Sequence, residues 1–224
     1  MTLTVIIPVF NEQKTIKESI REVLSQSAVD RILIVDDGST DKTPEILGSI
    51  SNNKIKVITH DKNLGKGSAL RTGFSKVGGG FVIVQDADLE YNPTEYSKLI
   101  KSASPNTAVY GSRIRGQNAH AYTRTYLGNV LVTAVCNLLF GTKLTDSYTC
   151  YKLLPTKIAK GLKLRSNGFE IEAEITAKLL KKGIKIIEIP IKYNPRTYEQ
   201  GKKIKAKDAL LGILTYLRIR FQTI

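Results

Sequence analysis

The chain has 224 residues, 42% of them hydrophobic, which is enough apolar material for one sizeable domain with its own core. Its 34 Lys and Arg against 20 Asp and Glu give a net charge of +14, and residues 151–224 hold 17 of the basic and 6 of the acidic residues. Such a surface attracts polyanions: nucleic acid, anionic lipid or phosphorylated substrates. Cys136 and Cys150 form no metal-ligand pattern, and we predict two free thiols in a reducing cytoplasm.

Strand-like and helix-like segments alternate along the first hundred residues. Buried-strand patterns predict strands at residues 3–9, 31–37, 54–60 and 80–88. Helix-like patterns lie between them, at residues 12–26, 39–50 and 66–77. This alternation predicts an α/β fold in which helices flank a mostly parallel sheet. Ligands bind beyond the carboxyl ends of strands in open sheets of this kind, and polar clusters lie there, at residues 8–12, 36–41 and 86–90.

The second half of the chain is expected to add strands at residues 107–114 and 185–193 and helices at residues 126–141, 170–182 and 208–221. Glu174 and Lys178 are spaced for an exposed ion pair. The uncharged run at 126–141 carries Asn129, Thr133 and Asn137 at every fourth place, which predicts an amphipathic helix packed on the domain or lying on a bilayer. We predict no transmembrane helix and no signal peptide, because no segment is long and apolar enough and the chain begins in strand-like sequence.

The stretch FVIVQDADLE, residues 81–90, places carboxylates at the end of a hydrophobic strand. Side chains alternate in a strand, so Asp86 and Asp88 are expected to point the same way. Two converging carboxylates repel each other unless a cation lies beside them, and oxygen-only ligands suit Mg²⁺ or Mn²⁺. The absence of His or Cys nearby argues against zinc. On this stretch alone, helix-capping or loop aspartates without a metal stay an open alternative.

Four motifs occur in a specific order: VIIPVFNE at 5–12, VDDGSTD at 35–41, NLGKGSALRTGF at 63–74 and DADLE at 86–90. The set resembles the inverting family 2 glycosyltransferases with the GT-A fold. Three later stretches are similar to the branch of dolichol-phosphate mannose synthase and other polyprenyl-phosphate glycosyltransferases: GSR at 111–113, TDSYTCYKLLP at 145–155 and EIPIKYNPRTYEQGKKI at 188–204. The resemblance implies a single GT-A domain, 1–224. Its nucleotide-sugar-binding half would be 1–110 and its acceptor-binding half 111–224, with interface helices at 126–141 and 208–221.

The resemblance also implies the site residues. A nucleotide-diphosphate sugar would be held by Pro8, Phe10, Glu12, Val35, Asp37, Asp86, Ala87, Asp88, Arg113, Arg196 and Lys202. The metal, Mg²⁺ or Mn²⁺, would be bound by Asp88 and Glu90, although many relatives carry Gln at position 90. The catalytic set would be Asp86, Asp88, Arg113 and Arg196. Gly65 and Gly67 suit either a close backbone approach to the ligand or a simple turn.

Arg113 would reach a phosphate, either the donor's or the acceptor's, and Arg124 would be a second contact to the acceptor phosphate or plain surface charge. Arginine suits phosphate because the planar guanidinium binds two oxygens at once. A phosphate monoester is mostly dianionic at neutral pH, with a second pKa of about 6, and needs no general base. Asp146 lies where a base would be sought, and the alternative is that it orients an arginine or caps a helix. Lys203 is interpreted as spare.

The predicted activity is transfer of a hexose from UDP-glucose, UDP-N-acetylglucosamine or GDP-mannose to a polyprenyl (dolichyl-type) phosphate, as in protein glycosylation. A polyprenyl acceptor predicts a cytoplasmic enzyme on the cytoplasmic face of a membrane, held by the lipid surface or by a membrane-anchoring partner. The alternatives are transfer to a sugar hydroxyl of a glycan, with Asp146 as base, and a non-catalytic nucleotide-sugar-binding protein. We predict no nucleic-acid partner, since the chain has no aromatic–basic platform and no recognised nucleic-acid-binding motif.

Overall fold

The computed structural model describes residues 1–116, 123–197, 199, 201, 203 and 205–222. Within this part of the chain seven strands form one sheet, in the order β3-β2-β1-β4-β6-β5-β7. The strands are β1 (Leu3–Val9), β2 (Arg31–Asp36), β3 (Ile55–Thr59), β4 (Phe81–Val84), β5 (Thr107–Ser112), β6 (Lys152–Pro155) and β7 (Lys185–Pro190). The helices are α1 (Ile16–Leu24), α2 (Thr43–Gly48), α3 (Lys66–Lys76), α4 (Tyr96–Lys101), α5 (Thr123–Phe140), α6 (Thr156–Gly161), α7 (Ile171–Lys181) and α8 (Ala206–Phe221), with a short 3-10 helix, η1 (Pro93–Glu95), before α4.

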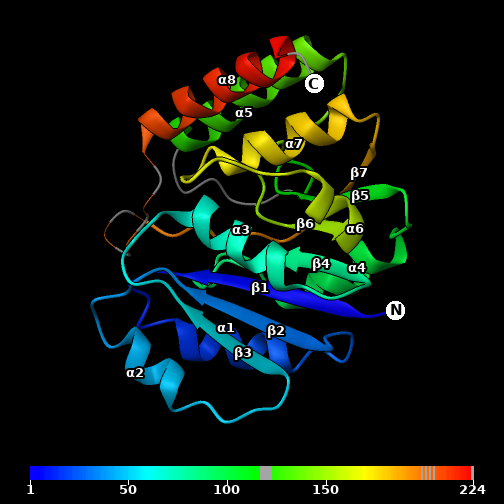
Figure 1. Cartoon of the computed structure of the whole chain (residues 1–224). Coiled ribbons are helices and arrows are strands. Elements are labelled where there is room, and N and C mark those ends of the chain that lie inside the picture. The colour runs from blue at the N-terminus through cyan, green and yellow to red at the C-terminus, as the bar shows by residue number, and fades with distance from the viewer. Residues whose placement is uncertain (117–122, 198, 200, 202, 204, 223–224) are drawn as a thin grey trace.

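The centre of the sheet is parallel and buried on both faces. β1 pairs in parallel with β2 and β4, with Ile7 opposite Ile34 and Ile6 opposite Val84. These strands are built from valine, isoleucine and leucine, as is typical of a parallel strand covered by helices on both sides. β3 forms the edge and is more exposed. The carboxyl ends of β1, β2 and β4 therefore lie side by side (Figure 1).

β6 is the exception to the parallel arrangement. It runs antiparallel to both of its neighbours, β4 and β5, while β5 and β7 pair in parallel. Of the three strands in the second half, β5 and β7 were expected from the sequence and β6 was not. The segment KLLP is short and starts with a lysine, so its pattern carries no strand signal of its own. Its insertion brings residues just before it to the end of β4.

A second, smaller core joins the last helices. α8 packs against α5 and α7, and the residues buried between them include Val132, Cys136, Ala177, Tyr216 and Ile219. Figure 1 shows α5 and α8 side by side at the end of the molecule away from α2, with α7 beneath them.

The polar stripe of α5 faces the domain. Asn129 donates to Asp146, Thr133 hydrogen-bonds Ser147, and Asn137 exchanges two hydrogen bonds with the backbone of Leu144. The opposite side of α5 and the outer side of α8 are apolar and exposed, and they carry Leu127, Leu131, Leu138, Leu210, Leu211, Leu214 and Phe221. The packing expectation is therefore confirmed, and an outward apolar surface remains. No helix in the described part of the chain has the length and apolar character needed to span a bilayer.

Two sequence-based expectations were wrong in detail. β4 ends at Val84 and not at residue 88, so strand alternation does not set the directions of Asp86 and Asp88. Glu174 and Lys178 do form an ion pair, at 2.6 Å, but Glu174 is buried and also accepts hydrogen bonds from the backbone of Arg165 and Ser166. Helical spacing identified the pair correctly and could not reveal the loop that covers it.

Candidate active site

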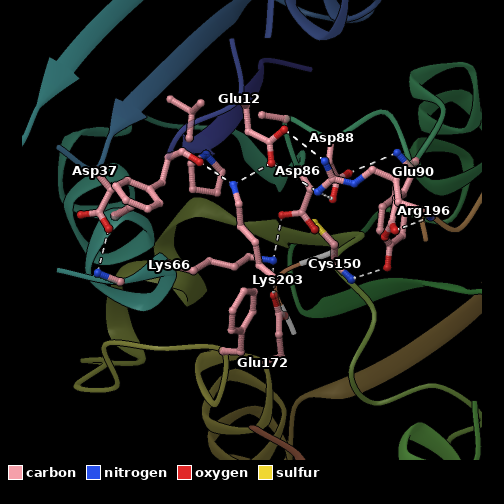
Figure 2. A pocket seen from close by; sticks show the side chains of 18 of the residues that line it. Glu12, Asp37, Lys66, Asp86, Asp88, Glu90, Cys150, Glu172, Arg196 and Lys203 are labelled. Carbon is pink, nitrogen blue, oxygen red and sulfur yellow. Dashed lines mark hydrogen bonds and ion pairs between the residues drawn. The ribbon is translucent and has the colours of Figure 1, made fainter. Parts of the chain in front are cut away.

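A cavity of about 620 Å³ opens at the carboxyl ends of β1, β2 and β4. Its walls come from segments far apart in the chain: the β1–α1 loop, the start of α3, the turn after β4, the residues before β6, the start of α7 and the segment after β7. Figure 2 shows acidic and basic side chains from these segments pointing toward one another inside it. The cavity lies at the strand ends, where open sheets of this kind bind ligands, and the binding of a ligand there stays a prediction.

The acidic turn after β4 is held from behind by a buried glutamine. Gln85 donates to the carbonyl oxygens of Asp86 and Tyr91, both at 3.1 Å. Its own oxygen accepts from the hydroxyls of Tyr96 and Tyr151, at 2.7 and 2.6 Å. With both ends of its amide satisfied, Gln85 fixes the backbone on which the carboxylates sit.

Asp86 and Asp88 both line the cavity but contact different cations. Lys66 Nζ lies 2.8 Å from Asp86 Oδ1, whereas Asp88 Oδ2 accepts from Arg196 at 2.9 Å. Burial is the largest single influence on Asp86 and opposes its ionisation, but the charge and hydrogen bond of Lys66, together with Cys150 and Arg196, leave the Asp86 pKa lowered. For Asp88, burial is the main cause that raises its pKa to about 7, and the charges of Asp86 and Glu90 add to it.

Arg196 sits at the centre of a second group of carboxylates. Its guanidinium lies 3.1 and 3.2 Å from the two oxygens of Glu12 and 2.9 Å from Asp88. Its backbone N–H donates to Glu90 at 2.6 Å, and the other oxygen of Glu90 accepts from the hydroxyl of Tyr193 at 2.6 Å. One arginine thus holds the loop after β7 against the acidic turn after β4 (Figure 2).

Lys203 is not spare. Its Nζ lies 2.7 Å from Glu12, donates to the carbonyl of Phe10 and lies 5.8 Å from the centre of the Phe10 ring. It adds a second positive charge beside Glu12. The sequence contained the residue, but nothing in its local pattern distinguished it from a solvated lysine.

Asp37 organises the loop before α3. It accepts from the backbone N–H groups of Leu64 and Gly65, the latter at 2.7 Å, and lies 2.7 Å from Nδ1 of His60. Gly65 has φ +96°, and a Cβ there would lie 2.3 Å from the carbonyl oxygen of Asn167. The glycine is therefore needed where this loop meets the segment before α7.

Asp146 is fully buried and is occupied by an arginine. Arg113 donates to it three times: from the backbone N–H at 3.0 Å, from Nε at 2.7 Å and from the guanidinium NH₂ at 2.8 Å. Asn129 donates a fourth hydrogen bond at 3.0 Å. Burial acts against ionisation, but Arg113 outweighs it and keeps the Asp146 pKa below its usual range. Of the two interpretations of Asp146, this geometry matches the one in which it orients an arginine.

The cavity brings together most of the residues expected from the family resemblance. They are Pro8, Phe10, Glu12, Asp37, Asp86, Ala87, Asp88, Glu90, Arg113 and Arg196. Val35 is instead buried within β2 and is not part of the cavity wall. Lys202 and the side chain of Arg124 lie outside the described residues. The roles of all these residues stay predictions.

Several cavity residues were missed by the sequence reasoning: Lys66, Tyr148, Cys150, Phe169, Glu172, Tyr193 and Lys205. Lys66 lies within the quoted NLGKGSALRTGF motif, next to both glycines, and its charge at a helix start beside the ligand end of the sheet was the available signal. Glu172 had none, since a glutamate in a helical pattern is normally exposed.

The carboxylates of the cavity are the groups that could bind a divalent ion. Among residues 1–116, 123–197 and the later described positions, no three carboxylate, imidazole or thiol groups form a ready cage for an ion. Mg²⁺ is usually bound through only one or two carboxylates, with substrate phosphates and water completing the shell. Asp88 and Glu12 already share one positive group, Arg196. Asp88 and Glu90 offer only oxygen donors, and these oxygens already accept hydrogen bonds from Arg196 and Tyr193. Two such carboxylates fit a hard cation that binds together with a diphosphate.

The solved structures place the architecture in a known class. Glucosyl-3-phosphoglycerate synthase of Mycobacterium tuberculosis, crystallised with Mn²⁺, uridine diphosphate and phosphoglyceric acid, superposes with a TM-score of 0.72 at 18% identity, covering 100% of this chain and 80% of that chain. The expected GT-A fold is confirmed. The family model "Glycosyl transferase family 2" matches residues 4–162. The chain belongs to this family, as its ordered motifs predicted.

The curated relatives include enzymes named for polyprenyl acceptors. The dolichol-phosphate mannosyltransferase of Pyrococcus furiosus is 29% identical over 226 residues, covering 97% of this chain and 62% of that protein. The UDP-N-acetylglucosamine–dolichyl-phosphate N-acetylglucosaminyltransferase of Methanococcus voltae is 28% identical over 237 residues, covering 96% and 93%. The low-salt glycan biosynthesis hexosyltransferase Agl6 of Haloferax volcanii is 30% identical over 206 residues, covering 88% and 49%. The chain thus spans about half to two thirds of the length of several relatives.

Proposed function

We propose that this family 2 glycosyltransferase is a metal-dependent, inverting enzyme that moves a hexose from a nucleotide-diphosphate sugar to a polyprenyl phosphate. The observation that carries the acceptor assignment is the pairing of Asp146 with Arg113. The carboxylate at the position of a general base is committed to an arginine that lines the cavity. A sugar hydroxyl needs a base, whereas a phosphate dianion needs positive charge to position it. The names of the Pyrococcus and Methanococcus relatives support the same acceptor class.

The donor would lie across the strand ends. Phe10 offers an apolar surface for the base, and the Asp37 region lines the same end of the cavity. Arg196 and Lys203, which neutralise Glu12 and Asp88 in this conformation, are placed to move to the diphosphate once it is bound. Arginine suits this exchange because its planar fork binds either a carboxylate or a phosphate with two hydrogen bonds.

Asp88 and Glu90 would hold Mg²⁺ or Mn²⁺, and the bound ion would neutralise the diphosphate as it leaves. Arg113, oriented by Asp146, would position the acceptor phosphate for attack on the anomeric carbon from the side opposite the nucleotide, which inverts the configuration. Arg124 is proposed as a second contact to this phosphate. In this proposal residues 1–110 supply most of the donor site and residues 111–224 most of the acceptor site, within one domain.

The lipid acceptor gives the exposed apolar surface of α5 and α8 a role. Leu131, Leu138 and Leu214 point outward from these helices, and basic residues lie at both ends of α8. Amphipathic helices of this kind lie in the membrane interface, and each basic residue near an anionic leaflet contributes about 1 kcal/mol. We propose that the enzyme sits on the cytoplasmic face of a membrane through this surface, alone or with an anchoring partner.

The activity test uses folded protein, Mg²⁺ or Mn²⁺, short polyprenyl phosphates in vesicles and one labelled donor at a time: UDP-glucose, UDP-N-acetylglucosamine or GDP-mannose. We expect labelled lipid from at least one donor and none when a polyprenol without phosphate is supplied. The Arg113→Ala variant should lose this product, while Arg115→Ala should keep it, because Arg115 is exposed and outside the cavity wall. Label transferred to an added oligosaccharide instead would favour the hydroxyl-acceptor alternative, and no product from any donor would contradict the proposal.

A further inference from the structure

A row of four charged side chains runs from the cavity wall into the protein, and only Asp86 among them belongs to the donor-binding residues expected from the sequence. Lys152 Nζ lies 2.5 Å from Glu172 Oε2, Glu172 Oε1 lies 3.2 Å from Lys66 Nζ, and Lys66 Nζ lies 2.8 Å from Asp86 Oδ1. The signs alternate along the row, so its four charges cancel. Figure 2 shows Lys66 reaching between Asp86 on one side and Glu172 on the other.

Among the residues of this row, Glu172 has the position expected of a residue that binds a ligand. It is 4% exposed, yet it lines the cavity. Its Oε1 accepts no hydrogen bond from the described residues, although the Lys66 ammonium is within ion-pair distance. A buried carboxylate oxygen without a hydrogen-bond donor is costly, and such groups in native proteins usually have a partner that the bare chain does not provide.

The surroundings of Glu172 suit a sugar ring. Phe169 lies at the same end of the cavity, with its ring centre 5.9 Å from Lys66 Nζ, and offers an apolar face. A hydroxyl group can donate to a carboxylate and accept from an ammonium at the same time, so a hydroxyl placed beside the Glu172–Lys66 ion pair can contact both partners. Asp86 joins this end of the cavity to the metal-binding turn, which is where the diphosphate of a donor would lie.

We propose that Glu172 and Lys66, beside Phe169, form the subsite for the donor sugar and that they select an uncharged hexose by its hydroxyl groups. This inference rests on the proposed function and specifies its substrate class. A sugar that carries a carboxylate would bring a third negative charge beside Asp86 and Glu172 and is expected to be rejected. Lys152 acts as a positioning residue, because it is buried and holds the other oxygen of Glu172.

The test is calorimetric binding with Mn²⁺ present. UDP and GDP are titrated first, then UDP-glucose, UDP-N-acetylglucosamine, GDP-mannose and UDP-glucuronate. The variant is Glu172→Asp, which keeps the charge that Lys152 needs but withdraws the carboxylate from the cavity; Glu172→Gln is the second variant. The matched control is Glu95→Asp, since Glu95 is also buried and paired with a lysine but does not line the cavity.

We expect Glu172→Asp to weaken binding of the preferred nucleotide sugar by about tenfold or more, as for loss of a hydrogen bond to a charged group, and to leave the nucleotide alone unchanged. UDP-glucuronate should bind wild type no better than UDP does. Three results would overturn the subsite and leave the proposed function standing. They are an equal loss of affinity for nucleotide and nucleotide sugar, no loss of affinity in either variant, and tight binding of UDP-glucuronate. Failure of folded wild type to bind any nucleotide overturns both.

Discussion

The buried ion pair between Arg113 and Asp146 can be tested by removing the charge of Asp146 and measuring stability. In Asp146→Asn one carboxylate oxygen becomes an amide nitrogen, so a donor faces the donors of Arg113 and Asn129. Breaking a buried ion pair by changing one partner costs about 3–5 kcal/mol, and each 1 kcal/mol lowers Tm by about 2–4 °C in a chain of this size. We therefore expect Tm to fall by about 6–20 °C.

The lowered pKa of Asp146 determines how its contribution to stability changes with pH. The pKa of Asp146 is lowered in the folded protein, so its contribution to stability is present above the ordinary aspartate pKa of about 3.9 and is lost as the pH falls below it. The difference between wild type and Asp146→Asn, measured by chemical denaturation followed by circular dichroism, should be full at pH 7 and shrink below about pH 4. Asn129→Ala, which removes one neutral donor, should cost less.

The same variant separates the two acceptor classes. If Asp146 only orients Arg113, activity and stability fall together, and the residual activity keeps the wild-type dependence on pH. The opposite result would be a variant with wild-type stability and almost no turnover, whose pH–rate profile has lost the rise that titration of a base produces. That result would refute our reasoning and identify Asp146 as a general base.

Three further outcomes are expected. Gly65→Ala, whose Cβ would lie 2.3 Å from the Asn167 carbonyl oxygen at φ +96°, should lower Tm and weaken nucleotide binding in a thermal-shift assay; an unchanged Tm would show that the loop moves freely. Asp88→Ala should abolish the gain in UDP affinity that Mn²⁺ gives to wild type, measured by calorimetry, and a retained gain would remove Asp88 from the metal site. Replacing the exposed Leu211 and Leu214 with glutamate should reduce cosedimentation with anionic vesicles several-fold without changing nucleotide binding, and equal sedimentation would exclude α8 as the membrane contact.

The first half of the fold is predictable because its signals are local. Strands such as Leu3–Val9 are continuous apolar runs, and the polar residues that follow them mark the ligand end of the sheet. β6 was missed because KLLP is stabilised by its two neighbouring strands and not by its own pattern. The apolar face of α5 was recognised, since its three polar residues recur with helical spacing.

The site was predictable only where a motif marked it. Asp86 and Asp88 are conspicuous after a hydrophobic strand, although their different cation partners depend on where β4 ends. Glu172 gave no signal, because its importance comes from a lysine on β6 and another at the start of α3. Contacts between residues so distant in the chain follow from the folded arrangement and from no local pattern.

The antiparallel strand between β4 and β5 has a consequence for biosynthesis. A ribosome that has completed β4 must still make β5 and α5 before β6 emerges to cover the open edge of Phe81–Val84. Until then the nascent chain carries an unpaired hydrophobic edge of the kind that recruits chaperones or aggregates. A fragment that stops after β5 is therefore expected in inclusion bodies and not as a small nucleotide-binding domain, so insertions and fusions are better placed at the chain ends than between the two halves.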